Sequence, residues 1–209
     1  MVVIHLQNIM GDIERLKEEA GVNACNFIKD GMKLGLGTGS TVRYTVIEIG
    51  RRISEDGLNV VGVPTSEETR ELALEVGIPL VTLSESGGLD LVIDGADEFD
   101  NNFSLIKGGG GALTREKIVA QSSKSMIVVA DDRKQVETLG DFDLPVEVLP
   151  FEWKRTRDRI SSICPGEVKL RGGSEPFITD NDGYILDCSF GPSISDPKSL
   201  EMKLLSFAG

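Results

Sequence analysis

Short apolar runs alternate with amphipathic segments along the first two thirds of this chain, and the alternation limits the folds open to it. Apolar residues at helical spacing predict helices over residues 13–27, 42–53, 65–76 and 112–121. Compact apolar runs predict strands at residues 32–36, 59–63, 80–83, 89–93 and 126–130. Strands that alternate with helices usually form a parallel sheet covered by those helices. The pattern therefore predicts a Rossmann-like α/β domain over residues 1–139, with helices on both faces of the sheet.

The pattern changes after Lys134. Strands are predicted at residues 146–149, 168–170, 177–179 and 184–188, and a charged helix over residues 151–163. Asp196 followed by Pro197 predicts the start of a last helix that runs through Leu205. Residues 140–209 are expected to form a smaller α+β domain. Earlier in the chain, Thr65 with Glu68 three residues later predicts a capping box.

The charge balance and the rare residue types exclude several classes of protein. The 22 basic and 34 acidic residues give a net charge of −12, which repels polyanions such as nucleic acid. Apolar runs fall short of the roughly 20 residues of a membrane span, and the start of the chain does not resemble a signal peptide, so we expect a cytoplasmic protein. The cysteines Cys25, Cys164 and Cys188 are expected to be reduced thiols. The one histidine, His5, is remote from every motif below, which argues against a Ser/His/Asp relay and a histidine metal site.

The first motif is GLGTGST at residues 35–41, between a predicted strand and a predicted helix. Free backbone N–H groups and the helix dipole favour an anion there, and the hydroxyls of Thr38, Ser40 and Thr41 add donors. A dinucleotide fingerprint fits poorly, because Ser40 stands where the third glycine is required and no ribose-binding acid follows the next strand. A monophosphate site is favoured over a plain tight turn.

The second motif is DGADE at residues 94–98, directly after a predicted buried strand. Open α/β sheets bind ligands at the carboxyl ends of their strands, and three acids within five residues repel one another. The alternative is a solvated acidic turn. The spacing does not resemble a calcium loop.

The third motif is KGGGGALTREK at residues 107–117, in which four glycines open a predicted helix. Such a run exposes backbone amides to a ligand at an entropic cost that a plain connector would avoid. A flexible loop is the alternative interpretation.

Together, in this order, the three motifs resemble the ribose-5-phosphate isomerase A family. The likeness extends to ADDRK at 130–134, LPVEV at 144–148 and TDN at 179–181, and it covers roughly residues 12–208. The resemblance implies a Rossmann-like domain with a phosphate site, and a smaller domain followed by a return segment that is missing after Gly209. It also implies a homodimer or homotetramer without metal or cofactor.

The implied reaction interconverts D-ribose 5-phosphate and D-ribulose 5-phosphate through an enediolate, in the non-oxidative branch of the pentose phosphate pathway. By the resemblance Glu116 is the general base, and Asp94, Asp97 and Lys107 are further catalytic residues. The substrate-binding residues that it implies are Thr38, Gly39, Ser40, Thr41, Asp94, Gly95, Ala96, Asp97, Lys107, Gly108, Gly109, Gly110 and Lys134.

The chemistry fits these residue types. A proton next to a carbonyl is removed by a positioned base such as Glu116, while a cation such as Lys107 and glycine amides stabilise the oxyanion. Opening the sugar ring needs a second acid–base group, for which Asp94 and Asp97 are both candidates. The alternatives are a sugar-phosphate sensor without catalysis and, less favoured, a nucleotide-dependent oxidoreductase or transferase that shares the glycine-rich turn.

Overall fold

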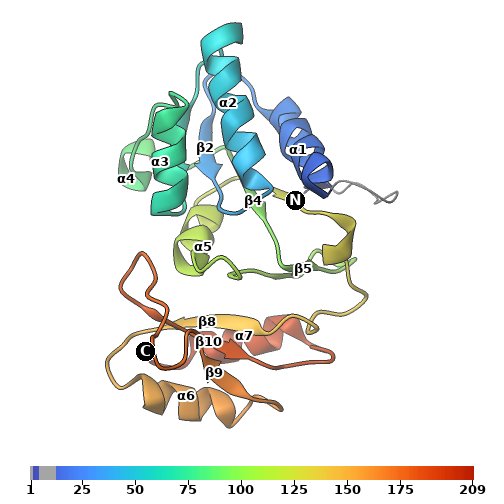
Figure 1. Cartoon of the computed structure of the whole chain (residues 1–209), viewed down its shortest axis with the longest axis vertical. Helices are drawn as coiled ribbons and strands as arrows, with labels where there is room; N and C mark the ends of the chain where they lie inside the picture. Colours follow the sequence, from blue (N-terminus) through green and yellow to red (C-terminus); the bar gives the residue numbers. More distant parts are fainter. Residues whose placement is uncertain (1, 5–12) are drawn as a thin grey trace. The chain divides into compact units, whose positions relative to one another are not determined.

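The computed structural model describes residues 2–4 and 13–209 (Figure 1). His5 lies outside these residues. Within them the chain divides into two compact units. The first unit comprises the described residues up to Ala96 together with Thr114–Lys134, and the second comprises Asp97–Leu113 and Gln135–Gly209. Residues 97–113 thus group with the second unit, whereas the boundary expected from the sequence lies between residues 139 and 140.

The first unit is built on a parallel sheet, which has five strands among the described residues. In sheet order they are β1 (Val2–Ile4), β7 (Met126–Val129), β4 (Leu91–Gly95), β2 (Lys33–Leu36) and β3 (Val61–Pro64), and every neighbouring pair is parallel. From β2 the chain crosses to β3 on one side, whereas from β4 it crosses to β7 on the other. The strand order therefore reverses between β2 and β4, where open α/β sheets place their ligands.

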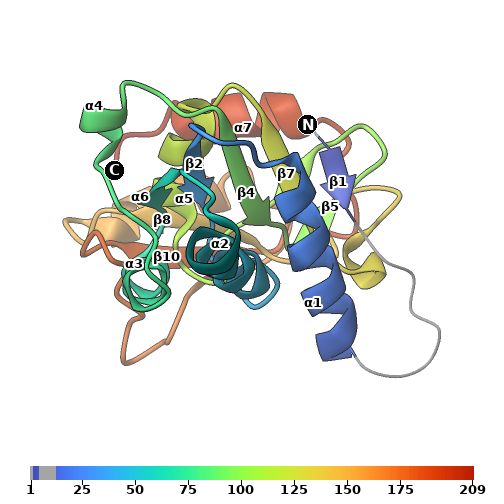
Figure 2. The same ribbon diagram turned by 90° about the horizontal axis from the view of Figure 1, so that it is seen from above.

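Helices cover both faces of this sheet, as the sequence predicts. They are α1 (Ile13–Ala24), α2 (Val42–Asp56), α3 (Glu67–Glu75), α4 (Leu83–Ser86) and α5 (Leu113–Gln121), with short 3-10 turns η1 (Cys25–Phe27) and η2 (Asp132–Lys134). Leu34 and Leu36 share a buried core with residues of α1, α2 and α3, which lie along one side in Figure 2. Gly35 faces the opposite way, where an added Cβ would lie 2.7 Å from Val119 of α5. Among the described helices, none combines the length and the apolar character that crossing a membrane requires.

Two local predictions for the first unit are wrong. Helix α3 is capped by Ser66 and not by Thr65: the Ser66 hydroxyl accepts a hydrogen bond from the Thr69 amide at 3.0 Å. Thr65 instead donates its hydroxyl to the carbonyl of Leu36. The strand expected at residues 80–83 is reduced to one bridge at Leu80, because the chain enters α4 through a capping box between Thr82 and Glu85.

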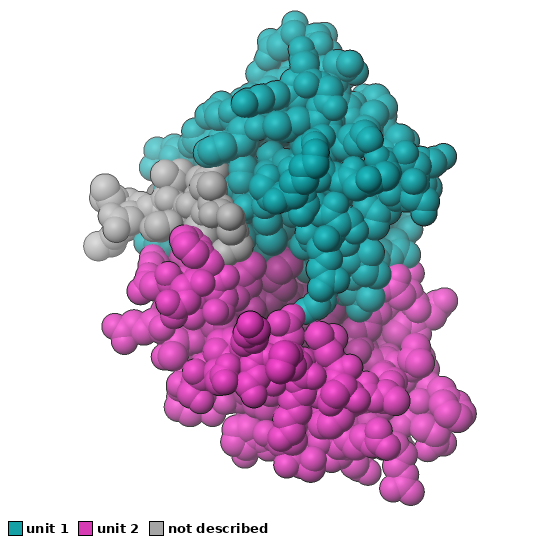
Figure 3. Space-filling model, turned by 180° about the vertical axis from the view of Figure 1, so that it is seen from behind, with its two compact units in different colours: residues 1–96, 114–134 teal, residues 97–113, 135–209 magenta. Residues whose placement is uncertain are grey.

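The second unit, coloured magenta in Figure 3, is a smaller unit with an antiparallel sheet and helices, the α+β class that the sequence predicts for the last part of the chain. Its antiparallel sheet has the order β8 (Leu144–Val148), β10 (Tyr184–Cys188), β9 (Val168–Leu170), and it is accompanied by α6 (Trp153–Ser161) and α7 (Pro197–Leu205). A separate hairpin pairs β5 (Glu98–Phe99) with β6 (Leu105–Ile106). The strand expected at residues 177–179 is wrong: the Phe177 amide bonds to the Arg171 carbonyl within a series of turns.

Candidate active site

The turn between β2 and α2 carries the first motif and is fastened to the end of β4. Asp94, whose side chain is fully buried, accepts hydrogen bonds at Oδ1 from the amides of Thr38 at 3.1 Å and Gly95 at 2.8 Å. The Gly37 amide donates to the carbonyl of Ile93 at 2.9 Å. Because a carboxylate bonded to amides resists displacement, Asp94 fixes the backbone of the turn where the strand order reverses.

The hydroxyls of this turn divide into two groups. The Thr38 hydroxyl donates to Ser66 Oγ at 2.8 Å and lies 2.7 Å from Thr65 Oγ1, so it belongs to a hydroxyl cluster at the start of α3. Ser40 is exposed, and Thr41, at the N-cap of α2, makes no capping hydrogen bond with its side chain. The first turn of α2 therefore keeps the positive end of its dipole available to an anion.

Glu116 lies in the first turn of α5 and is only 4% exposed. Helix α5 packs against the sheet through Val119, which shares an apolar cluster with Val92 of β4. Asp94 stands two residues after Val92 on the same strand. The buried carboxyl groups of the first unit thus include one at the end of β4 and one at the start of α5. Burying a carboxylate is costly, so such groups are candidates for a functional role.

The second and third motifs meet within the second unit. Asp97 Oδ2 accepts a hydrogen bond from the Gly109 amide at 2.7 Å, and the Asp97 amide donates to the carbonyl of Ile106 at 2.8 Å. Lys107 directly follows β6 and is half-buried. The backbone of Gly108 has a φ of +106°, a conformation that residues with a β-carbon rarely adopt. The glycine run is therefore an ordered turn that holds Asp97.

The last acid of the second motif has a structural role that the sequence did not reveal. Glu98 is buried, and its two carboxyl oxygens accept hydrogen bonds from the amides of Gly140 at 2.8 Å and Phe142 at 2.5 Å. This ties the strand after Asp97 to the loop before β8. Contacts across more than 40 residues leave no local pattern by which sequence reasoning could find them.

Further charged groups lie in the segment that follows β7. Asp131 is buried, and the guanidinium of Arg133 at 2.7 Å lowers the pKa of its carboxyl. Lys134, a predicted substrate contact, is half-buried in η2, and its amide donates to the Asp131 carbonyl at 3.0 Å. The signal that could have drawn attention to Asp131 is its place directly after a buried strand. Among the described residues, no group of three or more His, Cys, Asp or Glu side chains is arranged to hold a metal ion.

The predicted site residues therefore fall into two sets, each considered within its own unit. Thr38, Asp94, Glu116 and Lys134 belong to the first unit. The rest of the first-unit set is Gly39, Ser40, Thr41, Gly95 and Ala96. Asp97, Lys107, Gly108, Gly109 and Gly110 belong to the second unit. Within each unit, residues far apart in sequence are joined by hydrogen bonds, as with Thr38 to Asp94 and Gly109 to Asp97.

Comparison with known proteins finds relatives of this chain in one family. The family model of ribose 5-phosphate isomerase A (phosphoriboisomerase A) matches residues 61–209. Ribose-5-phosphate isomerase A of Bacillus mycoides is 50% identical over 195 residues, which cover 93% of this chain and 87% of that protein. That of Cereibacter sphaeroides (strain ATCC 17025) is 52% identical over 204 residues, covering 94% and 81%.

Solved structures show the same likeness. Ribose 5-phosphate isomerase A of Methanocaldococcus jannaschii superposes with a TM-score of 0.89 at 41% identity, covering 95% of this chain and 88% of that one. A D-ribose-5-phosphate isomerase in complex with phospho-erythronic acid also gives 0.89, at 39% identity, with 94% and 87% covered. Similarity of this extent in both sequence and fold shows common descent. The chain belongs to the ribose 5-phosphate isomerase A family.

Proposed function

We propose that Glu116 is the general base of this ribose-5-phosphate isomerase. In the open-chain aldose, the base removes the proton from C2 to give an enediolate, and the protonated base then delivers a proton to C1; while it is on the base, this proton can exchange with solvent. The hydroxyl proton moves from O2 to O1, so atoms and electrons balance without a redox partner. The burial of Glu116 in the first turn of α5, directly after the glycine run, is the observation that carries this assignment.

The other groups take roles suited to their surroundings. The start of α2 with Ser40 and Thr41 receives the phosphate, because its dipole and donors favour an anion. Lys107 and the amides of the glycine run stabilise the charge that develops on the enediolate oxygens. Ring opening falls to Asp94 or Asp97, and replacing each by Asn distinguishes them: the ring-opening residue is the one whose loss slows turnover of the cyclic sugar more than exchange of the open chain.

The sensor alternative has no support in the comparisons, since the relatives named above are isomerases. Beyond the reaction itself, we propose that the protein acts in the non-oxidative branch of the pentose phosphate pathway, in the cytoplasm, as a homodimer or homotetramer. The family resemblance supports these three statements. Light scattering on the purified chain measures the oligomeric state directly.

Incubation with ribose 5-phosphate in heavy water, followed by NMR, tests the reaction. We expect ribulose 5-phosphate to accumulate and deuterium to enter the sugar at carbon, because the enediolate exchanges its proton with solvent through the base. Shifts of the protein signals without any product would show binding without catalysis and would refute the proposal. Phospho-erythronic acid, the ligand named with the solved relative, serves as an unreactive probe of the same site.

A further inference from the structure

We propose that Arg171 is a positioning residue that holds the glycine run of the third motif and, through it, the carboxylate of Asp97. The inference rests on the proposed function, because it matters only if Asp97 and the glycine amides meet the substrate. All the residues that carry it belong to the second unit. The sequence did not single out Arg171, which follows β9 in a stretch without a recognised motif.

The guanidinium of Arg171 donates hydrogen bonds from two of its edges. Its Nε and Nη2 form a bidentate pair with Asp187, at 3.0 and 2.5 Å. Its Nη1 donates to two successive carbonyls, those of Gly108 at 3.2 Å and Gly109 at 3.0 Å. Only 19% of the Arg171 side chain is exposed. A planar group with five donors in fixed directions sets the orientation of its acceptors, which a single ammonium group does not.

The contact reaches Asp97 through one peptide group. In a trans peptide the C=O and the N–H point in opposite directions. The peptide between Gly108 and Gly109 bonds through its oxygen to Arg171 and through its nitrogen to Asp97 Oδ2, at 2.7 Å. A cation on the carbonyl polarises the peptide and strengthens the N–H as a donor. The same holds for the next peptide group, between Gly109 and Gly110. Its carbonyl accepts from Arg171, so its N–H, which belongs to Gly110, points away from Arg171.

The residues that hold the Arg171 guanidinium belong to the antiparallel sheet and are fixed by its hydrogen bonds. The Arg171 amide donates a hydrogen bond to the carbonyl of Ile185 in β10, at 2.9 Å. Asp187 lies on the central strand of the sheet and is paired with a neighbouring strand on both sides. Phe177 closes the turn over the glycine run: its ring lies 5.9 Å from Arg171 Cζ, and a Cβ on Gly111 would come within 2.6 Å of it. The glycine run is therefore packed against a fixed surface.

Close packing also explains one glycine of the run. A Cβ on Gly109 would lie 2.9 Å from Asp97 Cγ, so only glycine allows the peptide to approach the carboxylate this closely. Gly110, by contrast, has open space around it and faces no such limit. The run thus combines a glycine needed for contact with Asp97 and an exposed glycine, Gly110. Arg171 sets the orientation of both peptides.

An ordinary structural ion pair between Arg171 and Asp187 is the competing interpretation, and the two differ in what they predict. A structural pair changes the melting temperature and leaves the turnover of the folded enzyme intact. A positioning residue changes kcat more than KM, because amides aimed at developing charge act chiefly in the transition state. A misplacement of about 1 Å at an active site can lower turnover by as much as roughly 100-fold.

The test compares Arg171→Met, Arg171→Lys and the control Arg157→Met in the full chain. Arg157 is an arginine of the same unit that contacts Trp153 and Asp158 but no motif residue. Measurements are kcat and KM for ribose 5-phosphate, the Kd of phospho-erythronic acid and the melting temperature. For Arg171→Met we expect kcat to fall by about 10- to 100-fold with KM and Kd changed less than about threefold, partial recovery in Arg171→Lys, and no change in the control.

Wild-type kcat in folded Arg171→Met would overturn the inference. If Arg171→Met does not fold, Arg171→Lys is the deciding variant. The single ammonium group of lysine cannot contact Asp187 and both glycine carbonyls at once, so a wild-type kcat in Arg171→Lys would also overturn the inference. Asp187→Asn gives an independent check, because it keeps Arg171 but loosens its orientation, and we expect a smaller loss in kcat of about threefold or more. Wild-type protein without turnover would overturn the proposed function as well, whereas an active wild type with unaffected variants overturns this inference alone.

Discussion

Gly37 lies so close to Asp94 that residue 37 has no room for a β-carbon: an ideal Cβ would be 2.5 Å from Asp94 Cγ and 2.6 Å from Asp94 Cα. The contact joins the carboxyl ends of β2 and β4, which are neighbours in the sheet. It also allows the Asp94 carboxylate to reach the amide of Thr38. The glycine of the first motif is therefore required by packing against Asp94, in addition to any approach by a phosphate.

Gly37→Ala is expected to destabilise the protein by about 1–3 kcal/mol or more and to abolish turnover, because backbone and carboxylate atoms cannot both move aside. Thermal unfolding and kcat measure the two effects. Gly110→Ala is the matched control, since no heavy atom lies within 4 Å of its added Cβ and its φ is not left-handed, so its melting temperature should stay at the wild-type value. Equal stability of Gly37→Ala and wild type would contradict the packing argument.

Glu116→Gln is expected to lower kcat by about two orders of magnitude or more, because the amide has nearly the shape of the carboxylate but cannot accept the C2 proton. Binding of phospho-erythronic acid should persist, since the start of α2 is unchanged. Steady-state kinetics and calorimetric titration give the two quantities. Glu19→Gln, at an exposed ion pair with Arg15, is the control and should turn over like wild type. Turnover of Glu116→Gln at the wild-type rate would remove Glu116 from the mechanism.

Elements with strong local signals could be predicted from the sequence. The strand at residues 184–188 is found at the predicted residues as β10, and Asp196 caps α7 by accepting from the Ser199 amide at 3.0 Å. The strand is indicated by its apolar pattern, and the helix start is indicated by a residue type that caps the first turn. The strand expected at 177–179 failed because Phe177 satisfies its amide within a turn, a choice that the apolar character of the segment does not reveal.

The candidate site also has features that the sequence predicts and features that it does not. The motifs predict that the glycine turn and Asp94 follow buried strands, and the structure places them at the ends of β2 and β4. What each side chain contacts depends on pairs far apart in the chain. The Arg171 bond to the Gly109 carbonyl spans 62 residues, and neither end carries a signal of the other. The roles assigned to the site residues remain predictions for the experiments described above.

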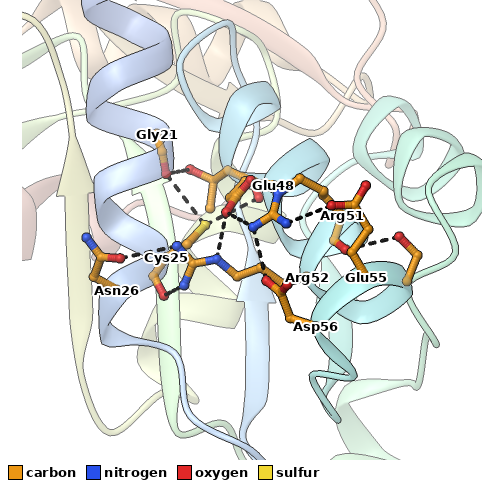
Figure 4. Close-up of polar contacts among 10 residues, drawn as sticks. Gly21, Cys25, Asn26, Glu48, Arg51, Arg52, Glu55 and Asp56 are labelled. Atoms are coloured by element: carbon orange, nitrogen blue, oxygen red, sulfur yellow. Dashed lines mark hydrogen bonds and ion pairs between the residues drawn. The ribbon is translucent and has the colours of Figure 1, made fainter.

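Acid should weaken the first unit through Glu48. This carboxylate is bidentate to Arg51 and also accepts from Arg52 Nε at 2.7 Å (Figure 4). Hydrogen bonding to Arg51 in the first place, and also to Arg52, lowers its pKa from 4.5 to about 2. A carboxyl whose pKa is lower in the folded state contributes stability above its unfolded pKa, and the contribution is lost as the pH falls through the folded pKa.

We therefore expect the free energy of unfolding to decline between about pH 4.5 and pH 2, with Glu48 contributing about 1–2 kcal/mol once the partial exposure of Arg51 is considered. Urea unfolding over this pH range measures the decline. Glu48→Gln should be less stable than wild type at pH 6 and should lose less stability toward pH 2. Parallel pH profiles for the two proteins would refute the role of Glu48.

The three thiols should be alkylated slowly in the native protein, and Cys164 should react first. Burial raises the pKa of Cys25 to about 12, moves that of Cys188 well above its ordinary value, and raises that of Cys164 as well. Alkylation requires the thiolate, so at pH 8 only a very small fraction of Cys25 is reactive at a given moment. Cys164 is 8% exposed, whereas the other two are fully buried. Iodoacetamide with mass spectrometry should therefore label Cys164 first in the native protein, and all three rapidly in urea. Native labelling of Cys25 ahead of Cys164 would contradict both the burial and the pKa argument.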